Sequence, residues 1–134
     1  MTSEPSRVLL VEDDWALRRI IQLNLAARGY QVDVAASGAA ALELTQQHPD
    51  IIVVDLGLPD MDGIDLITHI RRFSATPILV ASARDAHDWR PAALGAGADR
   101  YLAKPFAIDQ LIGALRDILA RQEPPLGHPL RLPA

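Results

Sequence analysis

The chain has 134 residues, of which 49% are hydrophobic and 22% charged, and it contains no cysteine. This length allows one domain with a substantial core, and the composition is typical of a soluble globular protein. A net charge of -4 argues against nucleic acid as a ligand of the chain itself, because binding to a phosphate backbone needs a basic face. The lack of cysteines, of an apolar signal peptide and of a membrane-spanning run indicates a cytoplasmic protein without disulfides or thiolate metal sites.

The first part of the chain alternates an apolar run with a helical period, and then repeats this pattern. We expect a strand, a helix ending near a glycine, a second strand, and a helix with a serine N-cap. The corresponding positions are Arg7 to Val11, Trp15 to Gly29, Gln31 to Ala35, and a helix following Ser37. The inward face of the first helix is predicted to carry Leu17, Ile20, Ile21, Asn24 and Leu25.

The central segment IIVVDLGLPDMDG predicts a strand that is buried on both faces and ends in a carboxylate, Asp55. A helix is expected from Gly63, with an inward face formed by Leu66, Ile67, Ile70 and Phe73. The apolar run ILVAS then predicts a further buried strand that ends at Ser82. Asp55 and Ser82 thus stand at the carboxyl ends of buried strands, and in parallel sheets the functional crevice lies beyond these ends.

The last part of the chain predicts a helix from Trp89 to Ala96, in which Pro91 should stand in the first turn, because proline disrupts a helix interior. A short strand from Tyr101 to Ala103 and a strongly amphipathic helix should follow. Five alternations of strand and helix predict an α/β flavodoxin-like fold, a five-stranded parallel sheet of order 2-1-3-4-5 with five helices on both faces. Residues 1–121 would form this domain, and residues 122–134, which are rich in proline, a linker or tail.

The strand ends should bring several acidic groups together. Glu12, Asp13 and Asp14 follow the first strand, Asp55 ends the third, and Ser82 and Lys104 end the fourth and fifth. Carboxylates held this close repel one another unless a cation joins them, and Mg²⁺ prefers such oxygen ligands. With the lysine and the hydroxyl, the group predicts a pocket for a small oxyanion such as a phosphoryl group on or near Asp55.

The motifs VEDD, DLGLPDMDG, SAR and GADRYLAKPF resemble the receiver domain of bacterial two-component response regulators, over Arg7 to Arg121. The segments around Asp55 and Ser82 look most like the winged-helix transcriptional subfamily, in particular its potassium-responsive members. The resemblance implies a domain that accepts a phosphoryl group from a sensor histidine kinase and controls an output, here transcription. DNA binding would belong to a separate C-terminal domain that is absent from this chain.

The resemblance also implies a role for individual residues. Asp55 would be the phosphoacceptor, and Mg²⁺ would be held by Glu12, Asp13, Asp55 and the backbone carbonyl of Gly57. Lys104 would pair with the phosphoryl group and form a cis bond to Pro105, and Ser82 would bond a phosphoryl oxygen. Tyr101 would swing inward as Ser82 moves, which would change the surface formed by the fourth helix, fifth strand and fifth helix.

On this surface the family forms a symmetric dimer through charged residues, here Arg90, Asp99, Arg100 and Arg121. The family usually has an acidic residue at Arg100 and often a basic one at Ala114. These departures put the homodimer in doubt, and Trp89 and Pro91 are atypical for the fourth helix.

Several other interpretations remain open. Asp14, Asp60 and Asp62 could be metal ligands, although helix capping explains them more simply. Ser82, Lys104 and Tyr101 could be ordinary strand-end residues. Apart from a kinase-driven switch, the chain could be a phosphate-independent interaction module, a Mg²⁺-dependent aspartate phosphatase, or a flavin or nucleotide carrier. Gly57 lacks the acid/base group that phosphatases usually need there, and no phosphate-binding glycine loop is present.

Overall fold

The computed structural model describes residues 6–122, which form five strands and five helices in strict alternation. In chain order these are β1 (Arg7–Val11), α1 (Trp15–Ala27), β2 (Gln31–Ala35), α2 (Gly38–Thr45), β3 (Ile51–Val54), α3 (Gly63–Arg71), β4 (Ile78–Ser82), α4 (Ala86–Ala96), β5 (Arg100–Ala103) and α5 (Ile108–Gln122). The last helix takes in Gln122, and the remainder of the predicted proline-rich tail lies outside the described residues.

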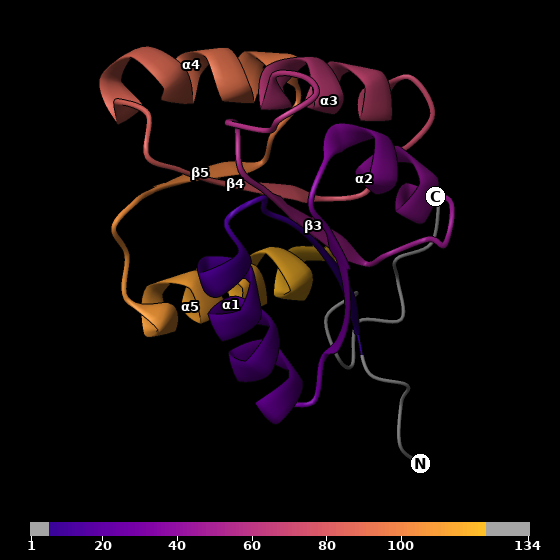
Figure 1. Ribbon diagram of the computed structural model, residues 1–134, viewed down its shortest axis with the longest axis vertical. Coiled ribbons are helices and arrows are strands. Elements are labelled where there is room, and N and C mark those ends of the chain that lie inside the picture. The colour runs from indigo at the N-terminus through magenta and orange to yellow at the C-terminus, as the bar shows by residue number, and fades with distance from the viewer. Residues whose placement is uncertain (1–5, 123–134) are drawn as a thin grey trace, which may run out of the picture.

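All strand pairs are parallel and the sheet has the order β2-β1-β3-β4-β5, which confirms the predicted fold. Helices α1 and α5 cover one face of the sheet, and α2, α3 and α4 cover the other (Figure 1). In residues 6–122, no helix combines the length and the apolar character needed to cross a bilayer. Parallel strands joined by helices bring all strand carboxyl ends to the same edge of the sheet.

The sheet separates two apolar clusters, because successive side chains of a strand point to opposite faces. Leu9, Ile52 and Val80 pack with α2, α3 and α4, whereas Leu10 and Val53 belong to the cluster that packs with α1 and α5. Each fully buried leucine or isoleucine stabilises the fold by about 1.5–3 kcal/mol relative to an exposed one. This double burial fixes the register of the strands, and with it the positions of the polar residues that follow them.

Capping side chains determine where three of the helices begin. Asp14, Ser37 and Asp62 accept hydrogen bonds from backbone N–H groups of the first turns of α1, α2 and α3, as expected from the sequence. Asp60 does not cap α3. Its carboxylate instead accepts from the N–H groups of Gly38 and Ala39 at 2.8 and 2.9 Å, and so ties the loop after β3 to the start of α2.

Four details of the prediction are wrong. Ile20 is 50% exposed, since it lies beside the buried stripe of α1 formed by Ile21 and Leu25. Phe73 is 57% exposed, because the chain leaves the helical path of α3 after Arg71 and the 3.6-residue period no longer applies. Strand β5 starts one residue earlier than expected, at Arg100.

Helix α4 is the fourth difference. It begins at Ala86 and not at Trp89, because the side chain of Asp85 accepts from the N–H of His87 and caps the helix. Pro91 therefore lies in the helix interior and not in the first turn. Since proline has no N–H, α4 lacks one internal hydrogen bond at this point.

Candidate functional site

Three carboxylates meet where β1 and β3 end. The two strands are neighbours in register, with Val11 opposite Val54, so the residues that follow them are side by side. One carboxylate oxygen from each of Glu12, Asp13 and Asp55 lies within 4.8 Å of the others. The convergence predicted from the sequence is therefore present.

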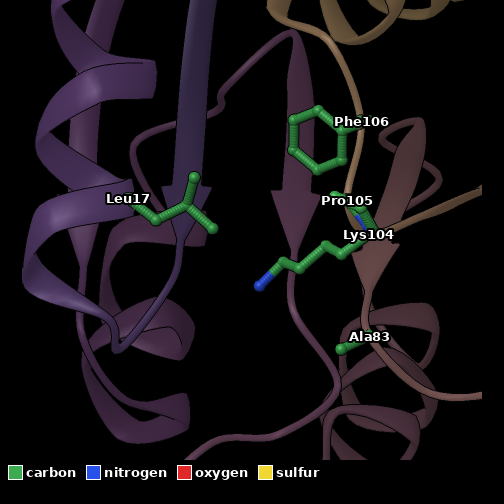
Figure 2. Close-up of a pocket in the computed structure, with 5 residues that line it drawn as sticks. All are labelled: Leu17, Ala83, Lys104, Pro105 and Phe106. Atoms are coloured by element: carbon green, nitrogen blue, oxygen red, sulfur yellow. The ribbon is translucent and has the colours of Figure 1, made fainter.

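Lys104 enters this group from the end of β5. Its Nζ lies 2.7 Å from Oε1 of Glu12 and 3.4 Å from Oδ2 of Asp55. Figure 2 shows the lysine side chain extending from its own strand with the amine directed away from it. The Glu12 side chain is only 3% exposed and that of Lys104 17%, so the ion pair is largely removed from water.

Burial and neighbouring charges shift the pKa values of this pair. Burial raises the pKa of Glu12, and the charge of Asp55 adds to this effect, although the hydrogen bond from Lys104 opposes it. For Lys104, burial acts to lower the pKa, but the hydrogen bond and charge of Glu12 and the charge of Asp55 outweigh it, so the pKa is raised. The lysine is thus held in its charged form by the carboxylates around it.

The donor set suits a hard divalent cation. Glu12 already uses both oxygens, because Oε2 accepts from the N–H of Asp14 at 3.1 Å while Oε1 accepts from Lys104. Asp13 is exposed, and Asp55 keeps partial exposure. Three carboxylates against one lysine leave surplus negative charge, and oxygen ligands of this kind are those that Mg²⁺ or Ca²⁺ prefers.

The loop after Asp55 is held in place from several sides. The N–H of Gly57 faces Oδ1 of Asp55 at 3.4 Å, and Gly57 forms a bridge to Asp62 across the loop. Gly63 packs directly against the loop, and a Cβ at this position would lie 2.5 Å from Cα of Leu56, so only glycine fits. These contacts constrain the backbone conformation of the loop after Asp55.

Ser82 and Tyr101 are linked through one residue that the sequence analysis assigned no role, Arg84. Ser82 is 1% exposed and its hydroxyl accepts from the N–H of Arg84 at 3.1 Å. Tyr101 is 5% exposed and its hydroxyl donates to the carbonyl of Arg84 at 2.8 Å. The tyrosine ring thus occupies the inward position, beside the loop that follows Ser82.

The Arg84 side chain makes further contacts. It pairs with Asp62 at 2.8 Å, donates to the carbonyl of Leu56 at 3.3 Å, and stacks at 4.4 Å from the ring centroid of Trp89. The only sequence signal for this residue is its place in the SAR motif, two positions after Ser82. Arg18 was also missed, and its guanidinium donates to the carbonyl of Glu12 at 2.8 Å.

A mainly apolar cavity of about 320 Å³ lies beside the acidic group. Figure 2 shows the residues that line it, which are Leu17, Ala83, Lys104, Pro105 and Phe106. The Lys104–Pro105 peptide bond is cis, as expected. The cavity thus opens beside the carbon stem of Lys104, whose amine is turned toward the carboxylates.

Three of the four charged residues of the predicted dimer face have partners within their own chain. Arg100 lies 3.4 Å from Asp117, and Asp99 lies 3.3 Å from Arg71. The guanidinium of Arg90 lies 5.7 Å from the ring centroid of Tyr101. Arg121 is exposed, whereas Ala114 is buried. Arg100, in β5, is therefore paired with Asp117 of helix α5 in the same chain.

Comparison with known proteins identifies the class to which this fold and site belong. The model of the response regulator receiver domain matches residues 8–116, and the chain belongs to this family. Its acidic group, lysine and serine lie at the strand ends of the matched region.

Two curated relatives show the place of the chain within the family. It is 43% identical over 115 residues to the transcriptional regulatory protein KdpE of Mycobacterium tuberculosis, with 85% of this chain and 51% of the relative covered. It is 45% identical over 117 residues to the KDP operon transcriptional regulatory protein KdpE of Escherichia coli, with 87% and 52% covered. The chain thus spans about half the length of the curated relatives it matches.

Among solved structures, the receiver domain of the Francisella response regulator 1452 superposes with a TM-score of 0.83 at 33% identity. The match covers 88% of this chain and 99% of that domain. The likeness thus extends over the whole of the solved domain.

Proposed function

We propose that this domain is a phosphorylation-activated switch of a two-component system, in which Asp55 accepts a phosphoryl group from a sensor histidine kinase. The observation that carries the proposal is the meeting of Glu12, Asp13 and Asp55 with Lys104 at the carboxyl edge of the sheet. A carboxylate beside a lysine and a cation site has what a phosphoryl acceptor needs, a nucleophile and positive charge for the transferred oxygens.

The transfer requires no proton at Asp55. A carboxylate oxygen attacks phosphorus, the bond from phosphorus to the donor breaks, and an aspartyl phosphate forms. The leaving group is the imidazole of a phosphohistidine, or acetate when the donor is acetyl phosphate. Lys104 is already beside Oδ2 of Asp55 at 3.4 Å, so it can stabilise the phosphoryl oxygens with little movement.

The cation of the site is Mg²⁺ in this proposal. Asp13 and Asp55 would supply carboxylate oxygens, Gly57 its backbone carbonyl, and Glu12 further negative charge. The ion would neutralise the charge of the phosphoryl group during transfer. Because Glu12 is engaged by Lys104 and by the N–H of Asp14, Asp13 is the more accessible member of the acidic pair.

The output of the switch is the surface formed by α4, β5 and α5. In this proposal Ser82 bonds a phosphoryl oxygen and stabilises the inward position that Tyr101 already occupies, which selects one arrangement of that surface. The names of the curated relatives support transcription as the output. Residues 1–121 would form the receiver and residues 122–134 a linker, with DNA bound by a separate output domain.

The domain would act in the cytoplasm as a phosphoacceptor, not as a turnover enzyme. Gly57 stands where an aspartate phosphatase needs an acid/base side chain, which disfavours that alternative. A symmetric dimer through the output face is also disfavoured, because Arg100 has the opposite charge to the residue usual in the family and is paired with Asp117.

The test is the intact mass of the protein after incubation with acetyl phosphate, with and without Mg²⁺. We expect one added phosphoryl group in the wild type that requires both Mg²⁺ and Asp55, and none in Asp55→Asn, which keeps the shape of the side chain and removes the nucleophilic charge. Circular dichroism should show that this variant is folded. An adduct of equal size in Asp55→Asn would refute the site, and no adduct in any sample would favour a phosphate-independent interaction module.

A further inference from the structure

The guanidinium of Arg84 contacts two parts of the molecule, the loop that follows Asp55 and the start of helix α4. It contacts Asp62 through two nitrogens, at 2.8 and 3.3 Å, and the carbonyl of Leu56 at 3.3 Å. Both partners belong to the loop that follows Asp55. On its other side the guanidinium stacks on Trp89 in the first turn of α4. This side chain therefore bridges the loop of the acidic site and the helix of the output face.

The contacts of Arg84 fix the orientation of its guanidinium. A guanidinium that meets a carboxylate with two nitrogens has its orientation fixed as well as its position, and stacking on an indole uses the same planar group. Arg84 is 26% exposed, and its partner Trp89 packs on the apolar cluster of α2, α3 and α4. Burial acts to raise the pKa of Asp62, but the hydrogen bond and charge of Arg84, together with the hydrogen bond from the N–H of Ile64, outweigh it, so the pKa is lowered.

We propose that Arg84 is a positioning residue that couples the loop after Asp55 to helix α4 through its stacking on Trp89. A ligand at Asp55 that displaces the backbone at Leu56 or the side chain of Asp62 must move the guanidinium, and Trp89 with it. This path uses side chains and is distinct from the link between Ser82 and Tyr101, which runs through the backbone of Arg84. The inference rests on the proposed function, since it assumes that Asp55 becomes phosphorylated.

Coupling of this type is measurable as a change in the exchange of backbone amide hydrogens, because exchange reports local opening of a helix. The wild type and Arg84→Ala are treated with acetyl phosphate and Mg²⁺ to the same phosphoryl occupancy, as determined by intact mass. Phosphorylation should alter exchange in α4 of the wild type. In Arg84→Ala most of this change in α4 should be lost, because the side chain that links the loop after Asp55 to Trp89 is gone.

Two further variants separate coupling from general damage. Arg84→Lys keeps the charge but loses the two-nitrogen contact and the planar stacking, so it should give an intermediate effect. Asp62→Asn keeps a capping oxygen for α3 and weakens the tether, so it should also reduce the change in α4. Arg72→Ala is the matched control. Its side chain is exposed and makes no hydrogen bond to any residue in 6–122, and it should behave as the wild type.

The outcomes distinguish the inference from the proposed function. If the wild type carries the phosphoryl group and α4 does not respond, or if Arg84→Ala responds in full, Arg84 does not couple the two regions although the site assignment stands. If Arg84→Ala is unfolded, a full response in both Arg84→Lys and Asp62→Asn overturns the inference. If the wild type accepts no phosphoryl group, the proposed function fails and the inference fails with it.

Discussion

The two edges of the sheet both carry ionic groups, but their charge balance differs. At the amino edge, Asp33 pairs with the side chain of Arg7, and Asp50 accepts from the N–H of the same residue at 2.7 Å. Asp99 pairs with Arg71 at this edge. Each of these carboxylates has a partner close by, and Asp50 and Asp99 directly precede strands β3 and β5, so these groups help to hold the sheet together.

At the carboxyl edge, three carboxylates share one lysine. Within residues 6–122, the ion pairs to Glu12 and Asp55 come from Lys104, and Asp13 has none. Such surplus charge costs stability unless another positive group completes it. Each edge thus carries three carboxylates, but two arginines face those of the amino edge and one lysine faces those of the carboxyl edge, so the two edges differ in charge balance and not in the number of acidic groups.

The largest effect is expected from Lys104→Met. The change leaves Glu12, which is 3% exposed, without a compensating charge, and should lower the free energy of unfolding by about 3 kcal/mol at neutral pH. Burial already raises the pKa of Glu12 above 4.5, and loss of the lysine should raise it further. Because the pKa of Glu12 is then higher in the folded than in the unfolded state, the loss of stability is absent well below pH 4.5. It develops as the pH rises from there through the pKa of the folded state, and it is fully present above that pKa.

Urea titrations from pH 4 to pH 8 test this prediction, with Arg100→Met as the control. Arg100 pairs with Asp117 at an exposed position, so its loss should cost less than about 1 kcal/mol at any pH in the range. A loss in Lys104→Met that does not change with pH would mean that packing of the lysine stem, and not charge, accounts for the effect.

Addition of Mg²⁺ should stabilise the wild type, because a ligand that binds only the folded state shifts the unfolding equilibrium. At about 100 times the dissociation constant the expected gain is about 2.7 kcal/mol, which thermal melting can detect. Asp13→Asn should lose most of this gain, since it removes the most accessible carboxylate of the group. Asp99→Asn, at the amino edge of the sheet, should keep the stabilisation by Mg²⁺. An equal gain in both variants would place the cation elsewhere.

The smallest effect is expected from Asp99→Asn without metal. The amide can still accept from the N–H of Ile78, 2.8 Å away in the wild type, but the charge that faces Arg71 is lost. We expect the free energy of unfolding to fall by about 1 kcal/mol, with phosphorylation at Asp55 unchanged. Asp13→Asn should do the reverse, with unchanged or increased stability and impaired phosphorylation. Impaired phosphorylation in Asp99→Asn would remove the distinction between the two edges.

The fold could be predicted because its signals are local. The run from Ile51 to Val54 is buried on both faces as its composition indicates, and the caps Asp14, Ser37 and Asp62 mark helix starts. The errors have different local causes. The start of α4 was misplaced because the cap Asp85 was not recognised. Phe73 continues the apolar period of α3 past its end, although the helix has stopped at Arg71.

The residues of the candidate site could also be predicted, since they follow strands whose order was known. Which of these side chains contact one another could not be predicted. Nothing local indicates that Lys104 contacts Glu12 more closely than Asp55, or that Asp60 holds α2 and not α3. Arg84 was missed for the same reason, because its partners Asp62 and Trp89 come together only in the folded chain.

The separation of the core by the sheet has a mechanical consequence for the output face. Helix α4 packs in one cluster with α2 and α3, whereas α5 packs in the other with α1, and the sheet lies between them (Figure 1). A rotation of α4 would therefore repack its own layer and leave the contacts of α5 with the other face of the sheet in place. A partner that contacts both α4 and α5 would then respond to the orientation of one helix relative to the other, on either side of β5.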